Sequence, residues 1–169
     1  RDRTGKAIRD LLIENKERLA KIEVKEMGKA IAEARGDVQE AIDIFEYMAG
    51  EGRRMFGHTT KSELRDKFAM TVRQPIGVVG LITPWNFPIA IFTGQIAAAL
   101  VTGNTVIAKP AEQTPLVAAR VVKIFHEAGV PKDVLQLLPG RGEVVGRALV
   151  EDPRIAGVIF TLSFNSSCA

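Results

Sequence analysis

Short apolar segments alternate with helical patterns through the second half of the chain, and this alternation restricts the fold more than any other feature. Four segments predict strands, and the first is apolar on both faces, as in a buried parallel strand. They cover residues 77–82, 105–108, 134–138 and 157–161. The helical patterns between them cover residues 88–101, 114–128 and 142–150. This order predicts βαβ units, and therefore an α/β fold with a Rossmann-like open parallel sheet and flanking helices. The second of these helices begins at Thr114 followed by proline, so we expect Thr114 to cap it.

A helical segment, residues 1–58, precedes the sheet. Apolar side chains recur along it at helical spacing, which predicts amphipathic helices. We predict that Gly36 ends the first helical run. Asp37, with Glu40 three residues later, then resembles a capping arrangement for a third helix. The expected role of the segment is to pack against the rest of the fold.

An extended bridging region, residues 59–76, is expected between the helical segment and the βαβ units of residues 77–161. Apolar and polar side chains alternate from residue 68 to residue 73, which predicts a half-exposed strand. Residues 162–169 form a divergent tail.

Composition and charge exclude several classes of function. The net charge is +3, but basic and acidic residues are interleaved, and one Trp and one Tyr provide few aromatic contacts. We therefore expect no nucleic-acid partner. The most apolar stretch, residues 89–101, is shorter than the roughly 20 residues that span a bilayer, so no membrane partner is expected. A single cysteine suits a reducing compartment, which predicts a cytoplasmic protein, with the mitochondrial matrix as an alternative. Because the chain begins at Arg1 without a methionine, we expect it to be a fragment or a processed product.

Ligands of open α/β sheets bind beyond the carboxyl ends of the strands. Three loops occupy such positions, at residues 83–88, 109–114 and 139–143. In the first loop, the amide of Asn86 offers two N–H donors without a charge, which suits an oxyanion that develops during a reaction. The alternative is that Asn86 only forms a turn beside a buried Trp85.

The second and third loops carry weaker indications of a nucleotide site. Lys109 and Glu112 could bind the two hydroxyls of a ribose, one as donor and one as acceptor. The alternative is a surface ion pair of little energetic value. In the third loop, Gly140 and Gly142 begin a glycine-rich turn. Gly146 comes one residue too late for the G-x-G-x-x-G dinucleotide fingerprint, so this signal alone is weak.

Together, these loops resemble a known family far more specifically than any one of them does. The stretches 73–88 and 103–115 are similar to signature stretches of the aldehyde dehydrogenase superfamily, in the expected order and spacing. Residues 127–131 and the turn at 140–142 continue the resemblance, which runs from the helical start to about Thr161. The chain would then be an incomplete aldehyde dehydrogenase fold, comprising its amino-terminal, cofactor-binding part.

The resemblance implies a role for individual residues. Asn86 would donate to the oxyanion of the thiohemiacetal, and Lys109 and Glu112 would bind the adenosine ribose. The residues implied at the cofactor are Ile82, Thr83, Pro84, Trp85, Asn86, Lys109, Ala111, Glu112, Gly142 and Ser163. No metal is implied. Because the charge of Glu112 should repel a 2′-phosphate, NAD is expected rather than NADP.

The implied reaction is the NAD(P)-dependent oxidation of an aldehyde or semialdehyde to the acid, through thiolate attack, hydride transfer and thioester hydrolysis. Residues 92–100 and 136–142 resemble the pyrroline-5-carboxylate (glutamate semialdehyde) dehydrogenase part of proline-utilisation proteins. Residues 49–54 look more like general aldehyde and semialdehyde dehydrogenases, and the alternative is a truncated general aldehyde dehydrogenase such as a succinate semialdehyde type. We expect glutamate semialdehyde as substrate and a homo-oligomeric full-length parent. The rival readings are a non-catalytic dinucleotide-binding or assembly module and a gene fragment without independent function.

The family pattern breaks at the end of the chain. Leu162 stands where the family has Gly, and only Ser163 fits the motif that follows. The nucleophilic Cys and the general-base Glu of the family would lie beyond this end. Cys168 lacks the setting of an activated thiolate, so we expect the isolated chain to be inactive.

Overall fold

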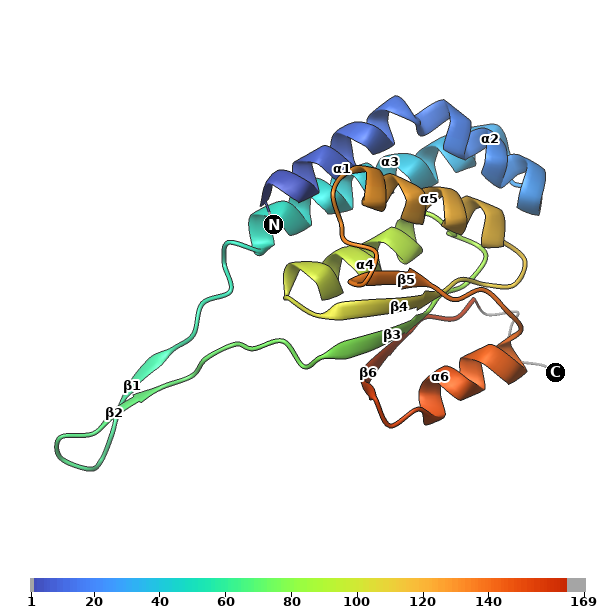
Figure 1. The fold of residues 1–169 in the computed structure, drawn as a ribbon. Helices are drawn as coiled ribbons and strands as arrows, with labels where there is room; N and C mark the ends of the chain where they lie inside the picture. The colour runs from blue at the N-terminus through green and yellow to red at the C-terminus, as the bar shows by residue number, and fades with distance from the viewer. Residues whose placement is uncertain (1, 164–169) are drawn as a thin grey trace.

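The computed structural model describes residues 2–163, and its centre is a four-stranded parallel sheet (Figure 1). The strands are β3 (Val78–Ile82), β4 (Thr105–Lys109), β5 (Leu135–Leu137) and β6 (Ile155–Phe160). Their order is β5-β4-β3-β6, so β3 lies between β4 and β6. Each strand overlaps the segment predicted for it, and every pairing in this sheet is parallel. The predicted α/β fold is confirmed.

The connecting helices lie on opposite faces of the sheet. Helices α4 (Ala90–Val101) and α5 (Pro115–Glu127) cover one face, and α6 (Arg147–Glu151) lies against the other (Figure 1). Close packing of α6 depends on Gly80 of β3, because a Cβ there would lie 3.0 Å from Cγ of Leu149. From β3 the strand order runs outward to β4 and β5, and β6 is then added on the other side of β3. The boundary between β3 and β6 is a topological switch point, where open α/β sheets bind ligands.

Three helices form a further layer above α4 and α5 (Figure 1). They are α1 (Asp2–Glu14), α2 (Lys16–Met27) and α3 (Ile31–Glu51). The prediction that Gly36 ends a helix is wrong. Helix α2 ends at Gly28, whose φ of 79° is left-handed, whereas α3 runs through Gly36. A helical glycine costs about 1 kcal/mol relative to alanine, and burial of Val38 and other apolar residues of α3 offsets that cost.

The predicted capping arrangement is also wrong, since Asp37 lies inside α3 and caps a different helix. Its carboxylate accepts hydrogen bonds from the N–H groups of Ile89 and Ala90, at the start of α4. Thr114 does hold the N-cap position of α5, but its hydroxyl makes no capping hydrogen bond.

Glu26 of α2 caps α5 in place of Thr114. Its carboxylate accepts from the N–H groups of Leu116 and Val117, at 2.6 and 2.9 Å. The amino-terminal helices thus supply carboxylates to the amino termini of α4 and α5. This arrangement is favourable because the amino terminus of a helix carries partial positive charge.

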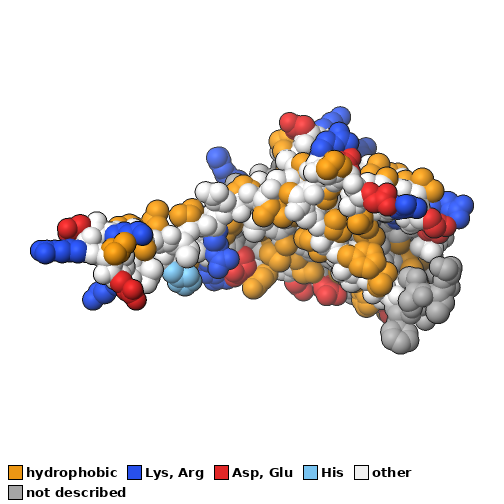
Figure 2. Space-filling model, turned by 90° about the horizontal axis from the view of Figure 1, so that it is seen from below, with side chains coloured by type: hydrophobic (Ala, Val, Ile, Leu, Met, Phe, Trp, Pro, Cys, Tyr) orange, Lys and Arg blue, Asp and Glu red, His pale blue; other side chains and the backbone are white. Residues whose placement is uncertain are grey.

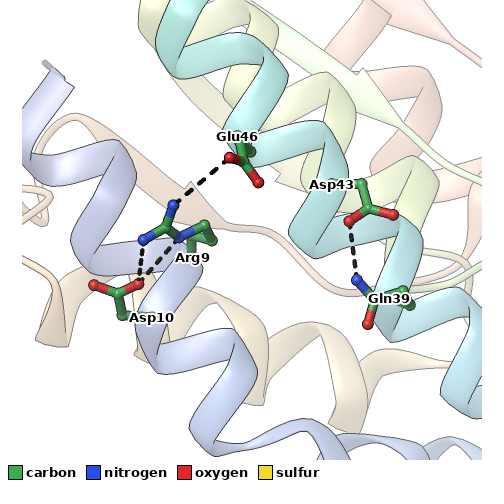
Figure 3. A network of polar contacts seen from close by, with 5 residues as sticks. All are labelled: Arg9, Asp10, Gln39, Asp43 and Glu46. Carbon is green, nitrogen blue, oxygen red and sulfur yellow. Dashed lines mark hydrogen bonds and ion pairs between the residues drawn. The ribbon is translucent and has the colours of Figure 1, made fainter.

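The hydrophobic core lies between these layers. Its largest fully buried side chains include Phe92, Phe125, Leu12, Leu19 and Leu81. On the outer side of α1 and α3, Arg9 contacts Asp10 and Glu46, and Gln39 donates to Asp43 (Figure 3). Exposed pairs of this kind contribute little to stability, so burial of apolar surface is what holds α1 and α3 together.

A hairpin projects from the body between α3 and β3 (Figure 1). Its strands, β1 (Thr59–Lys61) and β2 (Phe68–Met70), pair antiparallel. The strand predicted for residues 68–73 is therefore present but shorter, because the hydrogen-bonded partner strand has only three residues.

Candidate active site at the carboxyl edge of the sheet

The loops that follow the strands meet at the carboxyl edge of the sheet. The N–H of Thr83 donates to the carbonyl oxygen of Lys109 at 3.3 Å, which ties the loop after β3 to the end of β4. The N–H of Thr161 donates to the carbonyl oxygen of Ile82 at 3.1 Å, across the switch point. Parallel strands end at the same edge, so these predicted loops lie side by side as expected.

Lys109 is buried at this edge, with only 3% of its surface exposed. Its Nζ donates to the carbonyl oxygen of Pro110 at 3.0 Å. Burial lowers the pKa of Lys109, while the charges of Glu112 and Glu143 oppose that change. The alternative interpretation as a surface ion pair with Glu112 is wrong: Lys109 is not at the surface, and within residues 2–163 the structure records no ion pair between the two.

Glu112 lies in the loop after β4, and its carboxylate accepts from the N–H of Gly142 at a long 3.4 Å. Gly142 begins a short π-helical turn, η1 (Gly142–Gly146), that continues into α6. The turn passes over the end of the sheet, because a Cβ on Gly146 would lie 3.7 Å from the side chain of Lys109. Lys109, Glu112 and Gly142 are thus brought together, with Ala111 buried beside them.

The loop after β3 holds the candidate oxyanion donor. Thr83 and Pro84 are buried, and Trp85 and Asn86 are half-buried. Among the described residues, the side-chain oxygen of Asn86 is buried without a hydrogen-bond partner. An unpaired buried acceptor is costly, and a hydrogen-bond donor on a ligand, rather than an oxyanion, would satisfy it. The structure records no hydrogen bond between Asn86 and Lys109 or Glu112 in its described part.

Sequence reasoning missed the residue that holds this loop. Lys29, in the turn between α2 and α3, donates from Nζ to the carbonyl oxygen of Asn86 at 2.8 Å. The same Nζ lies 3.0 Å from Glu23 Oε1 and 4.3 Å from the ring centroid of Phe87. A lysine following a glycine after a helix carries no motif, so no sequence signal pointed to it.

The carboxyl group of Glu23 is fully buried. Burial, followed by the negative charge of Asp37, raises the pKa of Glu23 to about 7, although Lys29 opposes the shift. The pKa of Asp37 is raised as well, first by burial, while the N–H groups at the start of α4 oppose that change. The Glu23 carboxyl group contacts both the Lys29 ammonium, at 3.0 Å from Oε1, and the Asp37 carboxyl group.

The remaining predicted positions lie past β6. Ser163 is buried, whereas the Leu162 side chain is exposed. Cys168 lies outside the described residues. A second residue that sequence reasoning missed is Gln95 of α4, whose Nε2 donates to Oγ1 of Thr161 at 2.6 Å. This contact joins α4 to the end of β6, beside the switch point. The sequence pattern of α4 predicts only an apolar, buried helix.

No group of three or more His, Cys, Asp or Glu side chains among the described residues could hold a metal ion. Among those same residues, no helix is both long and apolar enough to cross a membrane.

Comparison with known proteins identifies the family. The model of the aldehyde dehydrogenase family matches residues 1–167. The chain belongs to the aldehyde dehydrogenase family. The resemblance inferred from the loops at 73–88 and 103–115 is confirmed.

The curated relatives of this chain include proteins of more than one kind. The chain is 54% identical over 138 residues to the bifunctional protein PutA of Klebsiella aerogenes, covering 82% of the chain and 10% of that protein. It is 43% identical over 152 residues to an α-ketoglutaric semialdehyde dehydrogenase of Bacillus subtilis, covering 90% of the chain and 31% of the relative. The chain thus spans about a tenth to a third of the length of these relatives.

Solved aldehyde dehydrogenase structures confirm the fold. An NAD-dependent aldehyde dehydrogenase of Sinorhizobium meliloti is 38% identical with a TM-score of 0.90, and the match covers 94% of this chain and 32% of that one. An NADP-dependent enzyme of E. coli is 36% identical with a TM-score of 0.91, covering 94% and 33%. Both cofactors occur among the structural relatives of this chain.

Proposed function

We propose that this chain forms the cofactor-facing part of an aldehyde dehydrogenase that oxidises glutamate semialdehyde to glutamate. The observation that carries the proposal is the 54% identity to the bifunctional protein PutA of Klebsiella aerogenes, against 43% to the Bacillus subtilis enzyme. The second candidate is a different semialdehyde: that of α-ketoglutarate, which the Bacillus subtilis relative favours, or that of succinate, which a 40% identical relative from Arabidopsis thaliana favours.

NAD is the proposed cofactor, held at the ribose by Lys109 and Glu112. A bound NAD would accept the hydride that leaves the aldehyde carbon. Lys109 keeps ammonium donors to offer, because the structure records one acceptor for it within the described residues, the carbonyl oxygen of Pro110. The long contact from Gly142 to Glu112 leaves that carboxylate free to accept from a ribose hydroxyl instead. Its negative charge disfavours the 2′-phosphate of NADP.

Asn86 is the proposed oxyanion donor. Its amide would donate to the aldehyde oxygen as negative charge develops there, and a donor of this kind contributes about 10²–10³ in kcat. The thiol nucleophile and the general base would come from parts of the protein outside residues 2–163. The single cysteine, Cys168, is not proposed as the nucleophile. A cytoplasmic location is also proposed, because a chain with a single cysteine suits a reducing compartment.

A chimera tests the reaction. The matching segment of this chain replaces its counterpart in the Klebsiella aerogenes protein, and NADH formation is measured with glutamate, α-ketoglutaric and succinate semialdehydes. We expect turnover with a preference for glutamate semialdehyde close to that of the unmodified protein. We also expect Asn86→Ala to lower kcat about 10²–10³-fold. A preference for another semialdehyde would support the second candidate. Unchanged kcat in Asn86→Ala would remove the oxyanion role.

A further inference from the structure

A buried cluster of three charged side chains lies beneath the loop that carries Asn86. Lys29 stands in the turn between α2 and α3, 57 positions before Asn86 in the sequence. Its side chain is 9% exposed, and that of Glu23 is fully buried. Asp37 of α3 is buried as well. None of these residues touches the ribose-side group of Lys109, Glu112 and Gly142 through a recorded polar contact within residues 2–163.

The cluster contacts the main chain at two places, at Asn86 in the loop after β3 and at the start of α4. At one end, the Lys29 ammonium donates to the main-chain oxygen of Asn86 at 2.8 Å. At the other end, the Asp37 carboxylate accepts from the N–H groups of Ile89 and Ala90, at 3.1 and 2.9 Å. Charge-assisted hydrogen bonds such as these are the stronger kind. The loop between Asn86 and Ala90 is thus clamped from a segment far away in the sequence.

The position of Lys29 is itself fixed from two sides. Its Nζ lies 3.0 Å from Glu23 Oε1, and 4.3 Å from the centre of the Phe87 ring. An ammonium over an aromatic ring is attracted to its face. Phe87 belongs to the same loop as Asn86, so the one ammonium contacts two consecutive residues of that loop and a buried carboxyl group of α2.

Burying three ionisable groups is costly, and a buried ion pair is weak support for stability as such. Apolar residues of similar size would join α2 to this loop at lower cost. What the charges provide is direction, because an ammonium and a carboxylate fix the orientation of the main-chain groups that they contact. The main chain at Asn86 in turn sets where its side-chain amide points.

We propose that Lys29 is a positioning residue for Asn86, held in place by Glu23 and acting together with Asp37 to fix the loop at residues 86–90. The proposal rests on the oxyanion role proposed for Asn86. Lys29 touches neither substrate nor cofactor in this scheme. It fixes the donor through the main chain, so that the donor is in place before charge develops on the substrate.

Trp85 allows a direct test in the 169-residue chain itself, because it is the only tryptophan and it precedes Asn86. Lys29→Met removes the charge but keeps an unbranched apolar side chain. We expect its Trp85 emission to shift and quenching by acrylamide to rise about twofold or more, as the loop is released. Lys29→Arg, which retains a cation and donors, should restore most of the wild-type signal. Lys25→Met removes an exposed charge from the last turn of α2 and should leave the signal unchanged.

Lys29→Met alone leaves two buried carboxyl groups without their cation, and it could unfold the chain. The double variant Lys29→Met with Glu23→Gln removes one positive and one negative group together and is the fallback. Circular dichroism and unfolding curves show whether each variant is folded. A folded single or double variant in which Trp85 has wild-type emission and quenching would overturn the proposal. Released Trp85 in Lys29→Met, with rescue by Lys29→Arg, supports it.

This outcome is separable from that of the proposed function. If Trp85 is released in Lys29→Met while Asn86→Ala leaves kcat of the chimera unchanged, Lys29 positions the loop and the oxyanion role is wrong. If Asn86→Ala lowers kcat while Trp85 does not respond to Lys29→Met, the oxyanion role stands and Lys29 is not its positioning residue.

Discussion

The carboxylate of Asp37, inside helix α3, accepts a hydrogen bond from the main-chain N–H of Ala90 at 2.9 Å, 53 positions further along the chain. Its other oxygen accepts from the neighbouring N–H of Ile89. The first donors of a helix have no partner within the helix itself. The amino-terminal helices therefore complete a helix of the βαβ units, and the two parts of the chain form a single folded unit.

The first prediction concerns this cap. Asp37→Ala leaves two buried N–H groups of α4 unpaired, so we expect the free energy of unfolding to fall by about 2 kcal/mol. Asp43→Ala, on the exposed side of the same helix, should change it by less than about 0.5 kcal/mol. Urea unfolding followed by circular dichroism measures both. Equal effects of the two variants would show that the buried cap carries no special weight.

The second prediction is a pH dependence of stability. The pKa of Glu23 is about 7 in the folded chain against an ordinary 4.5. Between these values the folded state binds more protons than the unfolded state, so the free energy of unfolding should fall as pH rises from 4.5 through 7. Glu23→Gln should remove a decrease on the order of 1–3 kcal/mol.

The measurement for Glu23 is a series of unfolding curves between these two pH values. Glu40→Gln, which alters an exposed carboxyl group of α3, is the control and should keep the wild-type slope. The buried Asp37 contributes a dependence of the same sign, because its pKa is raised too. Because the two carboxyl groups shift each other's pKa, the difference between wild type and Glu23→Gln reports on the pair. A Glu23→Gln curve parallel to wild type would contradict the assignment.

The third prediction concerns the cofactor. If Lys109 and Glu112 bind the ribose, the chain should bind NAD more tightly than NADP. Lys109→Met and Glu112→Gln should each weaken binding about tenfold or more, because each removes a charge-assisted hydrogen bond. Lys123→Met, at an exposed pair on α5, should leave the affinity unchanged. Isothermal calorimetry gives the affinities. Tighter binding of NADP than of NAD would count against the ribose assignment.

The fourth prediction is that the 169-residue chain by itself does not oxidise aldehydes. No cysteine lies among its described residues to act as the nucleophile, and an oxyanion donor alone does not form the thioester. Incubation with NAD and glutamate semialdehyde should give no steady NADH production. Turnover that is lost in Asn86→Ala would show that this expectation is wrong.

The fifth prediction is association through an apolar edge of the sheet. Strand β6 pairs with β3 only, and Val158, Phe160 and Leu162 at this edge are exposed. Apolar side chains gather on the underside of the molecule and along the hairpin (Figure 2). Unpaired strand edges and apolar patches favour association. We therefore expect the chain to be oligomeric or prone to aggregate.

Sedimentation at several concentrations, together with binding of a dye for apolar surface, measures this association. The double variant Val158→Lys with Phe160→Lys places charges on the edge and should shift the chain toward monomer. Val144→Lys, at an exposed position on η1, is the matched control and should not. A wild-type chain that sediments as a single monomeric species without binding dye would contradict the prediction.

Sequence patterns were sufficient for the elements of the sheet. The segment at 77–82 is short and apolar on both faces, which favours a strand covered on both sides. The same pattern predicts where the three loops lie, because all loops that follow parallel strands lie at the carboxyl edge of the sheet. Lys109, Glu112 and Gly142 could therefore be predicted as neighbours.

Sequence patterns failed where a residue acts on a distant segment. Asp37 was assigned to its own helix and Thr114 to its own cap, since local spacing is all that a capping motif contains. The low helix propensity of glycine predicted a helix end at Gly36. Propensity is a weak influence, and packing of α3 against its neighbours overrides it. Lys29 belongs to no local motif, so no pattern in the sequence predicts its contacts.

The sequence by itself thus determined the α/β fold, the family and the loops that carry the candidate site, because alternating apolar segments and contiguous motifs are local properties of a chain. Only the tertiary structure decided that Lys29, Glu23 and Asp37 converge beneath Asn86, and that Glu26 caps α5. Those contacts join residues tens of positions apart, and they form only when the helices of residues 2–51 pack onto α4 and α5. Burial in that interface also raises the pKa of Glu23. The residues next to Glu23 in the sequence form no pattern that predicts this shift.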